Sequence, residues 1–370
     1  MKVLVHIGRM IEVGGAEKAI VHLAQGLASR GIDVVFVSQF RTDGTSCIPL
    51  GTEYKVVSLC KGSDTLSFNF LNRFLGFRKV FRDEKPDAVV CFMPLAFITA
   101  SLWVNPRLVP LVYCERNNGT GDSALSTIVK KFIFKAKRIQ TATVVQTHGL
   151  ARHLKFNFAL ERNVFVIPNV IVAPGIQKNE YHEENLTLVS HGRLIERKGF
   201  DVLIQAFSRL VTEFPTLSLK IAGTGECKNE LESLVSSLGL EGKVELVGHL
   251  RNCNEFLASG SIGVYLSRSE GFPNALCEAL AVGLPVIASD CDFGPSDLIA
   301  SGTNGILLPK EIESNLDLIV NEIKNLILNA ELRKKLGVNA KQVIGTFNEE
   351  RNLDLWVDML QKLVTHKSVR

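Results

Sequence analysis

The sequence predicts an α/β protein built from two Rossmann-like, doubly wound domains that face a cleft. Its 370 residues, 46% of them hydrophobic, exceed what one ordinary core holds and suit two domains. Short apolar runs alternate with helical segments along the chain, which is typical of parallel sheets covered on both faces. A polar stretch without apolar periodicity, residues 169–184, separates two such series and reads as a linker.

The first series, residues 1–168, begins with a strand, a helix and a strand. Residues 3–7 form an apolar run, Gly14 and Gly15 open a helix that reaches Ser29, and a second apolar run follows Gly31 at residues 34–38. Further buried strands are expected at residues 88–92, 110–113, 142–146 and 164–167.

The second series, residues 185–345, again alternates strands and helices and predicts a second doubly wound domain. Its strands are expected at residues 186–190, 217–222, 244–247, 262–266 and 285–288. In the last segment, residues 346–370, apolar side chains recur at helical spacing, and we expect this amphipathic helix to return to the first domain.

Composition limits the class of protein. No apolar stretch approaches the roughly eighteen residues of a membrane helix, and a strand begins at once at the N-terminus, so we expect a cytoplasmic protein. The eight cysteines are scattered and are expected to be buried, reduced thiols. Lys and Arg exceed Asp and Glu by ten in residues 1–180, which favours an anionic partner, but no nucleic-acid-binding module accompanies them.

The most informative run follows the strand at residues 262–266. Gly271 and Pro273 mark the start of a helix, where free backbone N–H groups and the positive dipole end bind phosphate or sugar oxygens. Glu270 precedes this helix and Glu278 lies about a turn and a half into it, so both carboxylates can accept sugar or ribose hydroxyls. The alternative is that both are ordinary charges at a helix start.

A second run follows the first strand of the second domain, where ligands bind in open sheets. Arg193 and Lys198 can reach into the crevice there and stabilise a leaving diphosphate without a metal ion. A solvated surface charge is the alternative for Lys198. No P-loop pattern occurs, and the histidines at positions 6, 148, 153 and 249 have no second ligand nearby, so neither a metal nor a cofactor is assigned.

Together these features resemble the retaining glycosyltransferases of the GT-B fold, specifically family 4, also called glycosyl transferases group 1. Glu270 and Glu278, with seven residues between them, match the paired-glutamate motif of that family, and Arg193 and Lys198 match its diphosphate-binding pair. The similarity extends over the whole chain and implies a metal-independent enzyme.

The resemblance assigns roles to residues. It implies that Glu270 contacts the donor sugar and that Glu278 contacts the ribose. It also implies that backbone amides at the helix start contact the sugar and the diphosphate. It also implies that Gly14 and Gly15 meet the diphosphate, that Gly223 and Gly225 line the nucleotide pocket, and that Leu250 and Arg251 flank a base, with UDP favoured. The helix-start residues are Gly271, Phe272, Pro273, Asn274, Ala275 and Leu276.

One position departs from the family pattern. Many relatives place a histidine after the fourth strand of the first domain, where this chain has Glu115. The run Glu115, Arg116, Asn117 and Asn118 is similar to some lipid-linked oligosaccharide transferases, which implies that Glu115 binds the acceptor or orients its hydroxyl. A structural ion pair is the alternative.

Two segments combine basic and aromatic residues, at positions 68–82 and 130–138. Either segment could lie as an amphipathic helix on an anionic membrane surface, with its rings in the headgroup boundary. The alternative is that the rings face the core while the cations stay in solvent.

We therefore expect a retaining glycosyltransferase that moves a hexose or N-acetylhexosamine from a nucleotide diphosphate sugar to a glycan or lipid-linked saccharide, in surface polysaccharide or glycolipid assembly. Its place would be the inner face of the cytoplasmic membrane. Two alternatives stay open: a nucleotide-sugar epimerase of the same architecture, and a non-catalytic subunit that binds nucleotide sugars.

Overall fold

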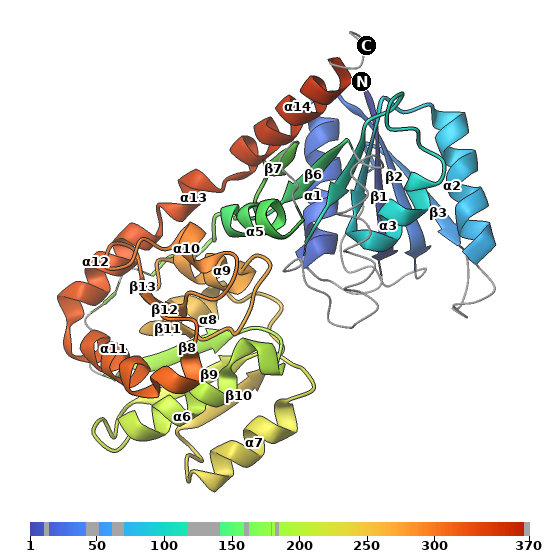
Figure 1. Cartoon of the computed structure of the whole chain (residues 1–370). Coiled ribbons are helices and arrows are strands. Elements are labelled where there is room, and N and C mark those ends of the chain that lie inside the picture. The colour runs from blue at the N-terminus through green and yellow to red at the C-terminus, as the bar shows by residue number, and fades with distance from the viewer. Residues whose placement is uncertain are drawn as a thin grey trace. The chain divides into compact units, whose positions relative to one another are not determined.

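The chain forms two compact units, shown in Figure 1. The computed structural model describes residues 1–10, 15–41, 52–60, 70–116, 141–158, 163–178, 180–181 and 185–365. The first unit comprises Met1–Val170 and Glu350–Arg370, and the second comprises Ile171–Glu349.

The first unit is built on a seven-stranded parallel sheet in the order β3-β2-β1-β4-β5-β6-β7. Its strands are β1 (Lys2–Met10), β2 (Asp33–Arg41), β3 (Lys55–Cys60), β4 (Ala88–Phe92), β5 (Leu111–Cys114), β6 (Ala142–Val145) and β7 (Val164–Val166). Its helices are α1 (Gly15–Ser29), α2 (Phe70–Glu84), α3 (Met93–Ser101), α5 (His148–Phe158) and α14 (Glu349–Thr365).

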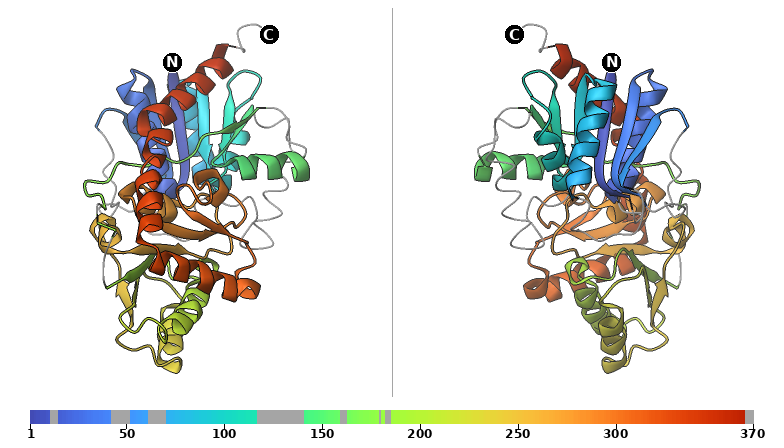
Figure 2. Two further views of the ribbon diagram at one scale, coloured as in Figure 1. Left: turned by 90° about the vertical axis from the view of Figure 1, so that its left-hand side faces the viewer. Right: turned by 90° about the vertical axis from the view of Figure 1, so that its right-hand side faces the viewer.

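Side chains of β1 alternate between two buried faces of this sheet, as strand geometry requires. Val3, Val5 and Ile7 belong to the core that includes α1 and α14, whereas His6 packs on Phe77 of α2 with ring centroids 4.9 Å apart. Because both faces are covered, Val3, Leu4, Val5 and Ile7 are all buried apolar residues, whichever face they point to. As predicted, the last helix belongs to the first unit, and Figure 2 shows α14 against its sheet.

The second unit contains a six-stranded parallel sheet in the order β10-β9-β8-β11-β12-β13. Its strands are β8 (Thr187–His191), β9 (Ser218–Ala222), β10 (Val244–Gly248), β11 (Ile262–Tyr265), β12 (Val286–Ser289) and β13 (Ile306–Leu308). Its helices are η1 (Glu196–Lys198), α6 (Phe200–Leu210), α7 (Lys228–Ser237), α8 (Asn254–Ser259), α9 (Asn274–Val282), α10 (Pro295–Leu298), η2 (Ile312–Asn315), α11 (Leu316–Leu328), α12 (Ala330–Ala340) and α13 (Val343–Thr346).

The second sheet is also covered on both faces. Apolar residues of α6, α7 and α11 form one core with alternate strand residues such as Leu188 and Val264. Residues of α8 and α9 form the other core with the intervening strand residues, among them Val189 and Val286. This layered α/β arrangement confirms the predicted fold class.

The stretch expected to be a linker is tied to the second unit. The amide of Ile171 donates to the carbonyl of Phe347, and the amide of Lys178 donates to the carbonyl of Val282. The Tyr181 hydroxyl donates to the Gly283 carbonyl at 2.9 Å. Residues 171–178 and 180–181 therefore continue the second unit.

Two strands were missed from the sequence, β3 and β13, and both are edge strands. The apolar run of β3 is interrupted by Ser58, and β13 is apolar but only three residues long. In β3, no residue with a described side chain is fully buried.

The sequence-based interpretation of residues 68–82 as a membrane-surface helix is wrong for its described part. Phe74 and Phe77 of α2 are 8% and 0% exposed, so these rings pack into the first unit instead of facing outward. Arg78, Lys79 and Arg82 stay exposed, as the alternative interpretation required, but Arg73 of the same helix is buried. Residues 130–138 lie outside the described residues.

Two further expectations concern membranes and thiols. Within the part of the chain that the structure describes, no helix is both long and apolar enough to cross a membrane. Among the cysteines whose side chains the structure describes, six are free thiols, and Cys91, Cys114, Cys277 and Cys291 of these are buried, as expected. Cys227 and Cys253 are only half-buried, and each lies just before the first residue of a helix.

Candidate active site

The candidate site lies at the carboxyl ends of β8 and β11. These strands are neighbours in the second sheet. After β8 the chain continues to β9 on one side, and after β11 it continues to β12 on the other side. Open α/β sheets bind ligands at such a switch point, because the loops diverge there and leave a crevice. The two runs singled out from the sequence begin here, since β8 ends at His191 and β11 at Tyr265.

Lys198 and Glu270 form an ion pair at this crevice. The Lys198 Nζ donates to Glu270 Oε1 at 2.6 Å, and the Ser267 hydroxyl donates to the same oxygen at 2.7 Å. The side chains of Lys198 and Glu270 are only 15% and 7% exposed. An ammonium group has three donors, so the lysine keeps hydrogen-bonding capacity beyond the one bond to Glu270.

Gly199 makes this approach of the two loops possible. It ends η1 with φ of 64°, and a Cβ there would lie 1.9 Å from the carbonyl oxygen of Leu266. Only glycine fits so close to a neighbouring backbone at positive φ. The loop after β8 is thereby held against the end of β11, which brings Lys198 to Glu270.

The start of α9 contributes backbone groups next to Glu270. Pro273 caps the helix, one residue earlier than the first-turn position expected from the sequence, and α9 begins at Asn274. The first amides of a helix have no acceptor within the helix and lie at its positive dipole end. Those of Ala275 and Leu276 are in this turn, and both residues line a small pocket with Ser267, Glu270 and Pro273.

Gly271 and Phe272, which precede the helix, are buried. The Phe272 ring packs in the core of the second unit and contacts Phe347, with ring centroids 6.3 Å apart. The side chain of Phe272 therefore anchors the loop, and any ligand contact of this residue would come from its backbone.

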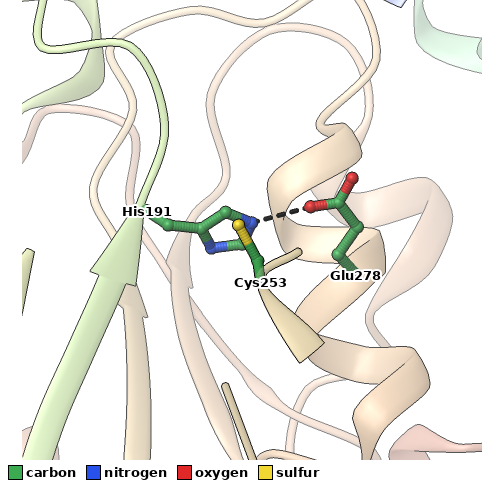
Figure 3. Close-up of side chains that lie close together, drawn as sticks. All are labelled: His191, Cys253 and Glu278. Carbon is green, nitrogen blue, oxygen red and sulfur yellow. Dashed lines mark hydrogen bonds and ion pairs between the residues drawn. The ribbon is translucent and has the colours of Figure 1, made fainter. Parts of the chain in front are cut away.

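Glu278 lies in α9, on the same crevice. Its Oε2 accepts a hydrogen bond from His191 Nε2 at 2.8 Å (Figure 3). The other ring nitrogen of His191, Nδ1, is 2.9 Å from the Tyr265 hydroxyl. His191 is 6% exposed, whereas the Glu278 side chain is 45% exposed. The carboxylate is thus fixed from the protein side and open to solvent on the other.

Burial raises the pKa of Tyr265 well above its usual value, and the charge of Glu278 adds to this effect. The Tyr265 hydroxyl therefore keeps its proton. Since a carboxylate can only accept, Nε2 of His191 carries a proton and donates it to Glu278, while Nδ1 contacts the hydroxyl of Tyr265. This chain of hydrogen bonds fixes the direction in which Glu278 faces.

Gly223 and Gly225 lie on the loop after β9, beside the loop after β8. A Cβ on Gly223 would lie 1.8 Å from the carbonyl oxygen of Gly192, and one on Gly225 would lie 2.3 Å from that of Leu194. The amide of Leu194 donates to the Thr224 carbonyl between them. Both glycines are therefore required for the packing of two loops at the crevice.

Other predicted residues lie farther along the same edge. Arg193 is exposed on the loop after β8, Leu250 is half-buried after β10, and Arg251 is exposed. In the described residues, the ion pair at the crevice involves Lys198, not Arg193.

Two predicted sites belong to the first unit. Glu115 follows β5, is fully buried, and accepts a hydrogen bond from the Tyr113 hydroxyl at 2.8 Å. Its neighbour Arg116 lies over the Phe92 ring and donates to Asn169 Oδ1 at 3.0 Å. Gly15 is the first residue of α1, while Gly14 lies outside the described residues.

Sequence reasoning missed three members of the site, namely His191, Tyr265 and Ser267. Each lies at or just beyond the carboxyl end of a parallel strand, so its place was a signal that could have been used. Their partners are distant in sequence, however, and the hydrogen bonds were not predictable. His191, Cys253 and Glu278 also form the one set of possible metal ligands found among the described residues.

Two family models match the chain. Residues 13–173 match the model described as Glycosyltransferase Family 4, and residues 175–343 match the model described as Glycosyl transferases group 1. Together they account for both units.

Among curated proteins, the chain is similar to the lipopolysaccharide core biosynthesis glycosyltransferase LpsE of Rhizobium meliloti. The two are 26% identical over 357 residues, which cover 94% of this chain and 96% of LpsE. The chain is also similar to the N-acetylgalactosamine-N,N'-diacetylbacillosaminyl-diphospho-undecaprenol 4-alpha-N-acetylgalactosaminyltransferase of Campylobacter jejuni. The two are 27% identical over 305 residues, which cover 81% of this chain and 77% of that protein.

Among solved structures, S. aureus TarM in a complex that contains UDP superposes with a TM-score of 0.81. The match covers 97% of this chain and 99% of that one at 15% identity. At this identity the similarity is one of fold.

Proposed function

We propose a donor, an acceptor class and a mechanism for this chain, which belongs to the group 1 and family 4 glycosyltransferases of the GT-B fold. It is related to glycosyltransferases of cell-surface polysaccharide assembly. The proposed reaction is retaining transfer of a hexose or N-acetylhexosamine from a UDP-sugar, without a metal ion, to a saccharide acceptor.

The observation that carries this proposal is the pair Lys198 and Glu270 at 2.6 Å, with Glu278 facing the same crevice. A nucleotide diphosphate sugar needs groups for its sugar, its diphosphate and its ribose. Glu270 would accept from the sugar hydroxyls, Lys198 would meet the diphosphate, and Glu278 would accept from the ribose. UDP is favoured because the TarM complex contains it.

Lys198 would supply the charge stabilisation that a metal ion gives elsewhere. When the bond from C1 of the sugar to the diphosphate oxygen breaks, negative charge grows on the diphosphate. A fixed ammonium in a mostly buried position stabilises that charge more strongly than it would in water. First-turn amides of α9 would add to the effect.

Retention would follow from a reaction on one face of the sugar. The acceptor oxygen would form its bond to C1 on the side from which the diphosphate leaves. The acceptor proton would pass to an oxygen of the departing diphosphate, so no base from the protein is required.

The acceptor is proposed to be a lipid-linked saccharide bound by the first unit, at the cytoplasmic face of a membrane. The printed name of the Campylobacter jejuni relative specifies a diphospho-undecaprenol acceptor. A diphosphate acceptor is anionic, and residues 1–180 carry ten more basic than acidic side chains. Glu115 is proposed to orient the acceptor hydroxyl.

A calorimetric screen of the full chain against UDP, GDP, ADP and their common sugar conjugates, with and without EDTA, tests the donor assignment. We expect selective binding of a uridine nucleotide that EDTA leaves intact. Binding of a guanine or adenine nucleotide alone, or binding that EDTA removes and a divalent ion restores, would contradict it.

Isotope-labelled donor tests the reaction class. With the donor alone we expect little change, and with a saccharide acceptor we expect a product whose anomeric configuration, read by NMR, matches that of the donor. Release of an isomerised nucleotide sugar without an acceptor would indicate an epimerase, and an inverted product would exclude retention.

A further inference from the structure

Three side chains from separate elements meet beside the proposed donor site. His191 ends β8, Cys253 immediately precedes α8, and Glu278 lies in α9. One ligand atom from each, an imidazole nitrogen, the thiol sulfur and a carboxylate oxygen, lies within 4.8 Å of the other two (Figure 3).

We propose that His191, Cys253 and Glu278 form a binding site for Zn²⁺ or a similar thiophilic divalent cation. An imidazole, a thiolate and a carboxylate are the ligand types that zinc takes in proteins. The thiolate disfavours Mg²⁺ and Ca²⁺, which prefer sites made of oxygen atoms alone. With three protein ligands, the fourth tetrahedral position would be left to water.

The distances require only small movements. Tetrahedral zinc, with bonds of about 2.0 Å to nitrogen or oxygen and about 2.3 Å to sulfur, separates its ligand atoms by about 3.3 to 3.6 Å. His191 Nε2 and Glu278 Oε2 are 2.8 Å apart, so this contact would open slightly to admit the ion. The thiol of Cys253, which is half-buried, would move inward by side-chain rotation.

The surroundings of His191 suit a metal ligand. Metal-bound imidazoles usually donate their second N–H to a fixed acceptor, which holds the orientation of the ring. Nδ1 of His191 is 2.9 Å from the buried Tyr265 hydroxyl, and a hydroxyl can accept as well as donate. On metal binding the ring proton would move from Nε2 to Nδ1, which then donates to Tyr265.

The ion could also reach the site. The side chain of Glu278 is 45% exposed, while that of His191 is 6% exposed. The open side gives the cation an entry path and leaves room for a water ligand, and the buried side holds the nitrogen ligand in place. Cys253 would bind as the thiolate, and its proton would be released to solvent.

Metal binding at this site would affect donor binding. This conclusion rests on the proposed function, in which Glu278 binds the ribose of the donor. One carboxylate cannot serve both partners in full, so cation and donor should exclude each other. The cation would then be an inhibitor that competes with the nucleotide sugar, and the transfer step would not use it.

Titration of the reduced full chain with Co²⁺, followed by absorption, tests the site without an activity assay. We expect a thiolate-to-cobalt charge-transfer band that Zn²⁺ abolishes by displacing Co²⁺. Cys253→Ser should lose this band, whereas Cys227→Ser, the other half-buried cysteine of the second unit, should keep it. Tyr265→Phe should keep the band but weaken cobalt affinity by about tenfold.

Absence of the band in the wild-type chain, or its persistence in Cys253→Ser, would overturn the proposal. His191→Asn gives a second test if circular dichroism shows that Cys253→Ser is misfolded. This variant too should lose cobalt binding, and unchanged affinity would overturn the site.

Addition of UDP then separates this inference from the proposed function. UDP that raises the apparent Kd for Co²⁺ supports both, and UDP binding without any cobalt band refutes the metal site alone. A Cys253-dependent band that UDP leaves unchanged supports the metal site and refutes the assignment of Glu278 to the donor.

Discussion

Lys198 and Glu270 are 72 residues apart in the sequence, yet their side chains are 2.6 Å apart and almost buried. Their contact depends on Gly199, which lets the loop after β8 approach Leu266 at the end of β11. The pair therefore links both strands of the switch point and gives the first prediction.

Replacing Lys198 with Ala should lower kcat by about 10² to 10³, because a donor aimed at developing negative charge is lost. Steady-state kinetics with a nucleotide sugar and a saccharide acceptor would measure this. Lys310→Ala removes an exposed lysine that pairs with Asp292 and should leave kcat unchanged. An unchanged kcat in Lys198→Ala would remove this lysine from the site.

Glu278→Ala should chiefly weaken donor binding, because the ribose loses an acceptor while the groups around the diphosphate remain. We expect nucleotide affinity in calorimetry to fall by about tenfold or more, the usual cost of a hydrogen bond to a charged group. Glu232→Ala, which removes an exposed glutamate of α7, is the matched control. A loss of kcat with unchanged nucleotide affinity would contradict the ribose assignment.

Glu115→Gln should lower acceptor-dependent turnover by about tenfold or more and leave nucleotide affinity unchanged, because the variant loses a charged acceptor in the first unit. Turnover and calorimetry together measure this. Tyr113→Phe, which removes the hydroxyl that donates to Glu115, tests whether the orientation of the carboxylate matters. Full turnover in Glu115→Gln, with lower thermal stability, would assign the residue a structural role only.

His6 should make the first unit less stable as pH falls. Burial lowers its pKa to about 4, although the hydrogen bond to the Val37 carbonyl acts in the opposite direction. The unfolded chain therefore binds the extra proton between about pH 6.5 and pH 4, and stability falls as pH decreases through that window.

Urea unfolding at pH 7 and pH 5 measures this effect. The wild-type chain should lose about 2 kcal/mol more than His6→Gln between these values. His249→Gln, which replaces an exposed histidine, should behave as the wild type does. Equal pH dependence in the wild type and His6→Gln would show that folding does not lower the pKa of His6.

Most of the fold was predictable from local patterns. Strands buried on both faces, such as β4 and β11, have continuous apolar sequences, and their positions were predicted to within one or two residues. The edge strands β3 and β13 were missed because Ser58 interrupts the apolar run of β3 and because β13 has only three residues. The aromatic residues of α2 were ambiguous for a related reason: helical periodicity shows that a face is apolar, but not whether protein or lipid covers it.

The sequence by itself determined that Glu270 and Glu278 flank the start of α9, because a helix fixes the spacing of residues close in the chain. It also placed Lys198 after the first strand of the second unit. Only the tertiary structure decided that Lys198 pairs with Glu270, and that His191, Cys253 and Glu278 meet. These contacts join loops from different parallel strands, and the order of strands in a sheet follows from packing over the whole unit, not from any local pattern.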